Sequence, residues 1–175
     1  VGATATGCLN GGSEDEETDE GEDGGNETDT DAGDGEQAAV EPVDVPEDAG
    51  GPVCEMAPAN FPGWNAQAVH EDGERAYFCS SGCMVAYKAY PDEFSVSDTG
   101  IAGVWVTGLE TRELIDGREA HYALETDAER LDDPMMTNPA PFEVREDAVA
   151  YVEEVDYLAE EDIVGYGDLD TDRAD

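Results

Sequence analysis

Apolar and polar residues first fall into a regular pattern in residues 64–78, WNAQAVHEDGERAYF. Two short extended segments in this stretch flank a turn formed by Glu71, Asp72 and Gly73, and this arrangement predicts a β-hairpin. A further strand is expected at residues 103–108, GVWVTG, because this stretch is nearly all apolar and is bounded by glycine.

A helix is expected between the hairpin and that strand. Large residues recur there at helical spacing before a proline, namely Met84, Tyr87, Tyr90 and Pro91. Ser80 and Ser81 lie at its start, and their hydroxyls are expected to accept hydrogen bonds from the free N–H groups of the first turn.

The second half of the chain repeats this plan. Residues 112–125, RELIDGREAHYALE, alternate around a turn at Asp116 and Gly117, and a helix is expected from about Glu143 to Val155. Its apolar residues fall on one face: Val144, Ala148, Tyr151, Val152 and Val155. Two strand–strand–helix units in tandem predict an α+β fold with helices packed on antiparallel sheet.

The acidic residues define the boundaries of this folded region. Residues 9–50 contain 17 Asp and Glu and neither Lys nor Arg, so this stretch is expected to be a disordered, self-repelling linker. The folded domain is then expected at residues 51–158. The chain becomes acidic again after Asp156, and residues 159–175 are expected to form a frayed tail.

Excess negative charge also belongs to the folded region. From Gly51 onward there are 29 acidic and 7 basic residues, which argues against nucleic acid and anionic lipid headgroups as partners. Six of the basic residues are Arg, and this composition resembles that of proteins from salt-loving archaea. The acidity is therefore interpreted first as a sign of a halophilic habitat and of solubility in high salt, rather than as a sign of a particular function.

The first eight residues, VGATATGC, are small and end in Cys8, where the acidic linker begins. They resemble the end of a lipoprotein signal, in which small residues precede a cysteine that becomes lipidated; the alternative is an ordinary start rich in small residues. No apolar run is long enough to cross a bilayer, so we expect membrane attachment through a lipid on Cys8. The domain would then lie outside the cell, on the outer face of the membrane.

Soft sulfur ligands are concentrated in three short segments. Apart from Cys8, every cysteine and methionine lies in one of them: Cys54 and Met56; Cys79, Cys83 and Met84; Met135 and Met136. Thiolates and thioethers together favour Cu(I), whereas thiolates alone or with imidazole also suit Zn(II). Met84 is expected to pack on the helix face, and His70 and His121 lie at strand positions, where a histidine is more often structural.

The pair Cys79 and Cys83 admits three interpretations: a disulfide, a redox dithiol, or metal ligands with Cys54 as a third sulfur. A redox dithiol usually has two intervening residues, and here there are three. The Cys83 thiolate is expected to be stabilised by the start of the helix, which favours metal binding. Because no Ser-His-Asp arrangement, phosphate-binding glycine loop or paired carboxylates stand out, enzymatic activity is not indicated.

Three segments together resemble the NosL family, the lipoproteins that are accessory to nitrous oxide reductase. They are VCEMAPANFPGWNAQAVHEDGERAYFCSSGCMVAYK, VWVTGLETRELIDGREAHYALET and PMMTNPAPFEVREDAVAYV, in order over about residues 51–155. Cys54 and Met56 match the family's Cys-x-Met, and Met135 matches its Pro-Met. The sequence departs from the family in Glu55 and Met136, where glycine is usual, and in having Cys79 and Cys83.

This resemblance implies a copper chaperone that binds Cu(I) outside the cell and passes it to nitrous oxide reductase or its maturation proteins, in denitrification. We expect Cys54 to be the anionic ligand, Met56 and Met135 to be exchangeable neutral ligands, and His121 to be a fourth. The main alternative is a structural or sensory module in which Cys54, Cys79 and Cys83 hold Zn(II) or copper. A thiol oxidoreductase is a third interpretation.

Overall fold

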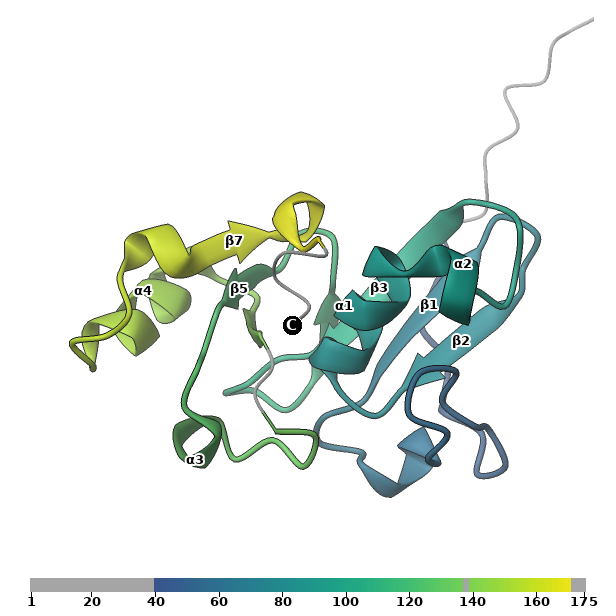
Figure 1. Ribbon diagram of the computed structural model, residues 1–175, viewed down its shortest axis with the longest axis horizontal. Helices are drawn as coiled ribbons and strands as arrows, with labels where there is room; N and C mark the ends of the chain where they lie inside the picture. Colours follow the sequence, from purple (N-terminus) through teal and green to yellow (C-terminus); the bar gives the residue numbers. More distant parts are fainter. Residues whose placement is uncertain (1–39, 137–138, 171–175) are drawn as a thin grey trace, which may run out of the picture. The chain divides into compact units, whose positions relative to one another are not determined.

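The computed structural model describes residues 40–136 and 139–170 of the 175-residue chain (Figure 1). The proposed lipidation site at Cys8 and most of the expected linker therefore lie outside the described residues. The chain is an α+β protein with two antiparallel sheets, as the sequence predicts.

The first sheet contains four antiparallel strands in the order β2-β1-β3-β4. They are β1 Ala66–His70, β2 Arg75–Phe78, β3 Ile101–Thr107 and β4 Leu114–Asp116. The predicted hairpin is confirmed, since Ala66 lies opposite Phe78 and Val69 lies opposite Arg75. The 3-10 helix η1, Pro58–Asn60, precedes it. Cys79 directly follows the last residue of β2 and therefore lies at the open end of this hairpin.

Helix α1, Ser81–Ala89, packs on β1 and β2, and the short helix α2, Pro91–Phe94, follows it (Figure 1). Proline therefore ends the first helix as predicted and also begins the second, where its missing N–H leaves no helical hydrogen bond unmade. The predicted capping by serine hydroxyls is wrong. Ser80 makes no side-chain cap, and the Ser81 hydroxyl instead donates to the Pro139 carbonyl at 2.7 Å.

The second sheet has three antiparallel strands in the order β6-β5-β7. Its strands are β5 His121–Ala123, β6 Ala140–Phe142 and β7 Ile163–Gly165, and the helices beside them are α3 Ala128–Leu131 and α4 Arg145–Glu153. Helix α4 confirms the helix expected near residues 143–155, and it packs on β5 and β6.

The strands on either side of Asp116 and Gly117 form, but they do not pair with each other. β4 pairs with β3 in the first sheet, whereas β5 belongs to the second sheet. A Cβ atom on Gly117 would lie 2.7 Å from the Val104 side chain, and the Gly117 N–H donates to the Val104 carbonyl at 2.8 Å. This glycine therefore permits close approach to β3 where the chain passes between sheets.

Residues 159–170, expected to lie in the acidic tail, contain regular structure. β7 is flanked by the 3-10 helices η2, Glu160–Asp162, and η3, Tyr166–Asp168, and Leu169 is fully buried. Residues 171–175 lie outside the described residues.

Residues 40–45, expected to belong to the linker, lie against the first sheet. The backbone N–H and carbonyl of Val43 pair with the side-chain amide of Gln67 at 3.0 and 2.8 Å, and Arg75 donates to the Glu41 carbonyl at 2.9 Å. Gln67 is fully buried. This segment, which we call the N-terminal strap, satisfies both polar ends of a buried amide.

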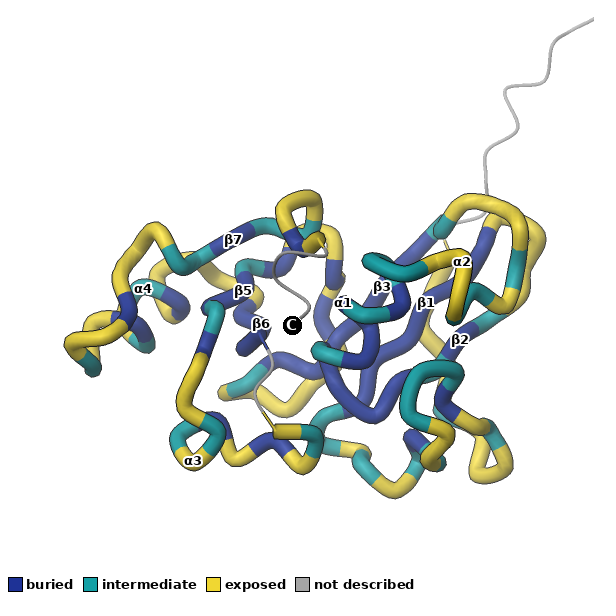
Figure 2. The backbone as a smooth tube through the Cα atoms, viewed as in Figure 1, coloured by how far each residue is buried: buried dark blue, intermediate teal, exposed yellow. Residues whose placement is uncertain are grey.

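Two groups of buried residues form the core. Figure 2 marks the buried residues along the backbone in dark blue. The larger lies between the first sheet and α1 and also takes in Tyr122, Val164 and Leu169 from the C-terminal half. The smaller packs β5 and β6 against α4. Cys79, Cys83 and Met84 belong to the larger group, and Cys54 and Met135 pack on it half-buried.

Candidate metal centre

Cysteines from two distant segments meet at the open end of the first hairpin. Cys79 directly follows β2, Cys83 lies in the first turn of α1, and Cys54 lies in the loop before η1. The Cys54 thiol donates to the Cys79 sulfur at 3.3 Å, and Cys54 is also near enough to Cys83 to raise the pKa of that thiol. All three are free thiols, so the disulfide considered for Cys79 and Cys83 is not present.

A tight loop presents Cys54 to its partners. The Gly51 N–H donates to the Met56 carbonyl at 2.7 Å, and the Glu55 N–H donates to the Gly51 carbonyl at 2.9 Å. A Cβ atom on Gly51 would lie 3.3 Å from the Cys54 sulfur, so glycine leaves this sulfur space to move. Cys54 is half-buried, whereas Cys79 and Cys83 are buried.

The environment of these thiols favours their protonated forms. Burial, followed by the neighbouring Cys54, raises the pKa of Cys79 to about 12 and that of Cys83 to about 11. The expectation that the helix start stabilises a Cys83 thiolate is therefore wrong for the metal-free protein, because burial outweighs it. A metal that binds here must displace protons.

The loop that contains the Pro-Met match lies close to the cysteines. Asp133 accepts a hydrogen bond from the Met135 N–H at 2.7 Å, and its charge contributes to the raised pKa of Cys79. Met135 packs half-buried on the same group of side chains as Cys79 and Cys83. The segment 133–135 thus approaches the thiols from the C-terminal half of the chain.

The other methionines differ in exposure. Met56 is 38% exposed, Met136 is 68% exposed, and Met84 is packed in the core as expected. Glu55 and Met136, where the resemblance described above implies glycine, have φ values of 58° and 81°. Both positions adopt the left-handed conformation that glycine favours, which agrees with that expectation.

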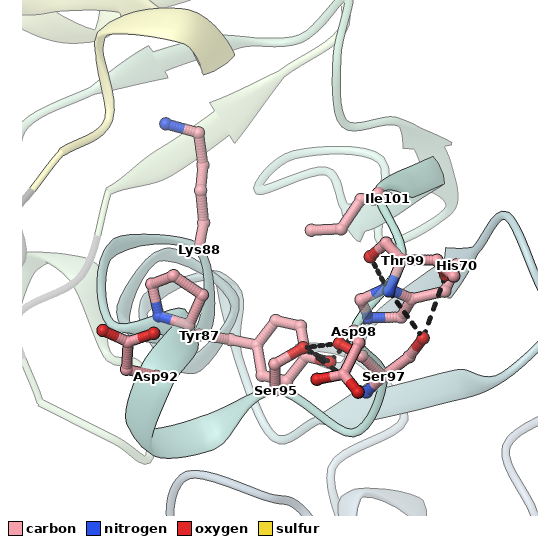
Figure 3. A pocket seen from close by; sticks show the side chains of 11 residues that line it. His70, Tyr87, Lys88, Asp92, Ser95, Ser97, Asp98, Thr99 and Ile101 are labelled. Carbon is pink, nitrogen blue, oxygen red and sulfur yellow. Dashed lines mark hydrogen bonds between the residues drawn. The ribbon is translucent and has the colours of Figure 1, made fainter.

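The histidines lie apart from this cluster. His121 is on β5, paired with Phe142 and Gly165, and no described contact brings it to a cysteine. Both ring nitrogens of His70 are hydrogen-bonded at 2.7 Å, to the Thr99 carbonyl and the Tyr87 hydroxyl, beside a pocket of about 500 Å³ (Figure 3). His70 is therefore a buried structural histidine.

Within residues 40–136 and 139–170, no three Cys, His, Asp or Glu side chains are already arranged around a common metal position. The metal-free protein instead presents the close pair Cys54 and Cys79, with Cys83 beside it and thioethers nearby. Sequence reasoning did not find the contributions of Gly51 and Asp133, because neither residue is itself a soft ligand.

Fold and site together define a small α+β protein with a partly exposed cluster of free thiols. The chain belongs to the NosL family, whose model, described as NosL, matches residues 42–162. The copper chaperone NosL from Shewanella denitrificans, known from a crystal structure, has a similar fold, with a TM-score of 0.57 and 14% identity over 75% of this chain and 97% of that one. No curated protein matches the chain.

Proposed function

We propose that this protein is a non-enzymatic, extracytoplasmic carrier of Cu(I) that supplies copper for the copper–sulfide centre of nitrous oxide reductase, directly or through its maturation proteins. The observation that supports this proposal best is the 3.3 Å contact between Cys54 and Cys79, which are 25 residues apart. Family membership and the similarity in fold to a copper chaperone of known structure agree with it.

The thiol pair suits Cu(I) because soft thiolates select this ion and need few additional ligands. Two sulfurs bound to one metal at about 2.3 Å each are about 3.8 Å apart at a tetrahedral angle and about 4.6 Å apart in line. The Cys54–Cys79 contact of 3.3 Å would therefore have to open by about 1.3 Å at most. Cys54 has the space for this movement beside Gly51.

Partial exposure suits release as well as binding. Cys54 is half-buried, so a partner's sulfur ligand can approach the metal before Cys54 leaves it, as in thiol exchange. Met135 and the exposed Met56 are neutral ligands that dissociate without leaving a charge behind. His121, which lies in the second sheet, has no support from the structure as a fourth ligand.

Location forms part of the same proposal. A lipid on Cys8 would attach the chain to the outer face of the cell membrane, with residues 9–39 as the tether. In the part of the chain that the structure describes, no helix has the length and apolar character needed to span a bilayer.

The test is an anaerobic Cu(I) titration against a competing chelator, using the full chain with Cys8→Ser so that only the site cysteines remain. We expect Cys54→Ser to lower affinity by more than about 100-fold, since losing a ligand should exceed the 10- to 100-fold effect of losing an outer-shell partner. Met135→Ala should lower affinity less, and the exposed Met136→Ala should lower it least.

Three outcomes would contradict the proposal or its parts. Native affinity in Cys54→Ser would exclude this residue as the main ligand. Loss only in the double variant Cys79→Ser, Cys83→Ser would place the site at those two thiols alone. Tightly held Zn(II) that resists a Cu(I) chelator, and whose removal unfolds the domain, would favour the structural zinc module. Transfer of bound copper to metal-free nitrous oxide reductase tests delivery.

A further inference from the structure

Ser80 has a buried hydroxyl with no hydrogen-bond partner. Its side chain is fully buried, and among the described residues its Oγ is the one buried side-chain oxygen or nitrogen without a partner. Buried hydroxyls in folded proteins are nearly always hydrogen-bonded, and an unpaired one destabilises the fold. An exception of this kind, between two candidate ligands, needs a physical reason.

Local structure does not supply that reason. Ser80 is the N-cap residue of α1, where a serine hydroxyl normally accepts from the first turn, yet it makes no such bond. Its carbonyl does accept from the Met84 N–H at 3.3 Å, so the backbone has its usual capping role. The neighbouring Ser81 hydroxyl is satisfied by the Pro139 carbonyl.

The position of Ser80 relates it to the thiol cluster. Ser80 directly follows Cys79. As the N-cap residue of α1 it also faces the third helical residue, Cys83, because the N-cap and third positions of a helix are the pair that a capping box joins. A hydroxyl favours a thiolate by donating its proton in a hydrogen bond, and such charge-assisted bonds are stronger than neutral ones. The hydroxyl has no comparable acceptor while the sulfur remains a neutral thiol.

We propose that Ser80 is a positioning residue of the copper site, whose hydroxyl donates a hydrogen bond to the Cys83 sulfur when Cys83 binds the metal as a thiolate. Cys83 is then the third sulfur of the site, beside Cys54 and Cys79. This inference rests on the proposed copper-carrier function. It assigns to Ser80 the part that outer-shell hydrogen bonds have in other metal sites, where they orient a ligand and increase affinity.

We expect loss of the Ser80 hydroxyl to affect the metal-free and the copper-loaded protein differently. In the metal-free protein, Ser80→Ala removes an unpaired polar group, so the thermal midpoint should stay the same or rise. In the copper-loaded protein the same change removes a ligand's partner, so Cu(I) affinity should fall by about 10- to 100-fold.

Ser81→Ala is the matched control. It deletes the same atom one residue along the chain, but it breaks an existing hydrogen bond to Pro139. We expect a lower thermal midpoint in the metal-free protein and unchanged Cu(I) affinity. Ser80→Thr retains a hydroxyl and should keep more affinity than Ser80→Ala, with the copper–thiolate ultraviolet absorption of the native protein.

The decisive measurement combines Ser80→Ala with Cys83→Ala in the full chain and compares Cu(I) affinities with those of the single variants. We expect Ser80→Ala to have no further effect once Cys83 is absent. If wild-type protein binds Cu(I) and Ser80→Ala retains native affinity, or if the two effects add, the role of Ser80 is refuted while the carrier function stands. If wild-type protein does not bind Cu(I), both fail.

Discussion

At the scale of single residues, the cysteine site combines buried thiols with one that is accessible. Cys79 and Cys83 are buried against α1 and the first sheet, whereas Cys54 comes from a loop and is half-buried. The buried pair gives the site a fixed position, because Cys83 belongs to α1 and Cys79 directly follows β2. The loop cysteine has space beside Gly51 for the movement that the proposed loading and release of copper would need.

The raised thiol pKa values predict how stability of the metal-free protein depends on pH. Cys79 and Cys83 keep their protons in the folded state to about pH 12 and 11, whereas unfolded cysteines lose theirs near 9.0. The free energy of unfolding should therefore fall as pH rises above about 9, by roughly 1 to 2 kcal/mol per buried thiol near pH 10.5.

Chemical denaturation at about pH 8 and pH 10.5 would measure this change. Burial also raises the pKa of Tyr122, which contributes with the same sign, so the comparison needs Cys79→Ala. Its decline between the two pH values should be smaller than that of the native protein. An equal decline would show that Cys79 does not contribute.

At the scale of elements, an ion-pair network fastens the second sheet to its helices. The Glu125 side chain is fully buried and accepts from Arg130 at 2.7 Å, from the Tyr151 hydroxyl at 2.8 Å and from two backbone N–H groups. Burial alone would raise the pKa of Glu125, but these hydrogen bonds lower it overall. Arg130 also lies over the Tyr151 ring.

Arg130→Ala should destabilise the protein by about 3 kcal/mol, because it leaves the buried Glu125 carboxylate without its cation. The control is Arg145→Ala. It removes the ion pair between Arg145 and Glu160, whose side chains are 49% and 59% exposed, respectively. That change should cost less than about 0.5 kcal/mol. Equal losses in denaturant unfolding would show that burial of this network adds no stability.

The elements that sequence patterns predicted well are those with local causes. The first hairpin depends on a turn within one segment. Both α1 and α4 depend on helical spacing of apolar residues, and Pro91 ends α1. The pattern around Asp116 and Gly117 misled because β4 and β5 pair with distant strands, which local alternation does not reveal. β7 was missed because three residues within an acidic stretch give almost no periodic signal.

The candidate metal centre shows the same difference between features with local causes and features that depend on distant contacts. Soft side chains identified Cys54, Cys79, Cys83 and Met135 as candidates, and all four contact the same core. Composition could not show that Cys54 meets Cys79, since that contact depends on how the loop before η1 packs on the hairpin. Nor could it show that the Ser80 hydroxyl is left without a cap partner.

At the scale of the whole molecule, the formal net charge of −39 dominates behaviour in solution. Repulsion among these charges opposes the compact state, and salt shortens its range from about 10 Å at 0.1 M to about 3 Å at 1 M. The thermal midpoint should therefore rise with NaCl over this range. KCl at equal ionic strength should act alike, and a midpoint indifferent to both salts would contradict the role of repulsion.

The N-terminal strap fixes the place where the preceding chain joins the first sheet. Val40 lines the same pocket as Val69, His70 and Gly73, near the turn of the first hairpin, whereas Cys79 follows the opposite end of that hairpin. Five residues of strand separate these ends by about 15 Å. Any restraint applied through the preceding chain therefore acts at the turn end of the first hairpin, and rotation about that end would carry the sulfur atoms at the opposite end through an arc of about this radius.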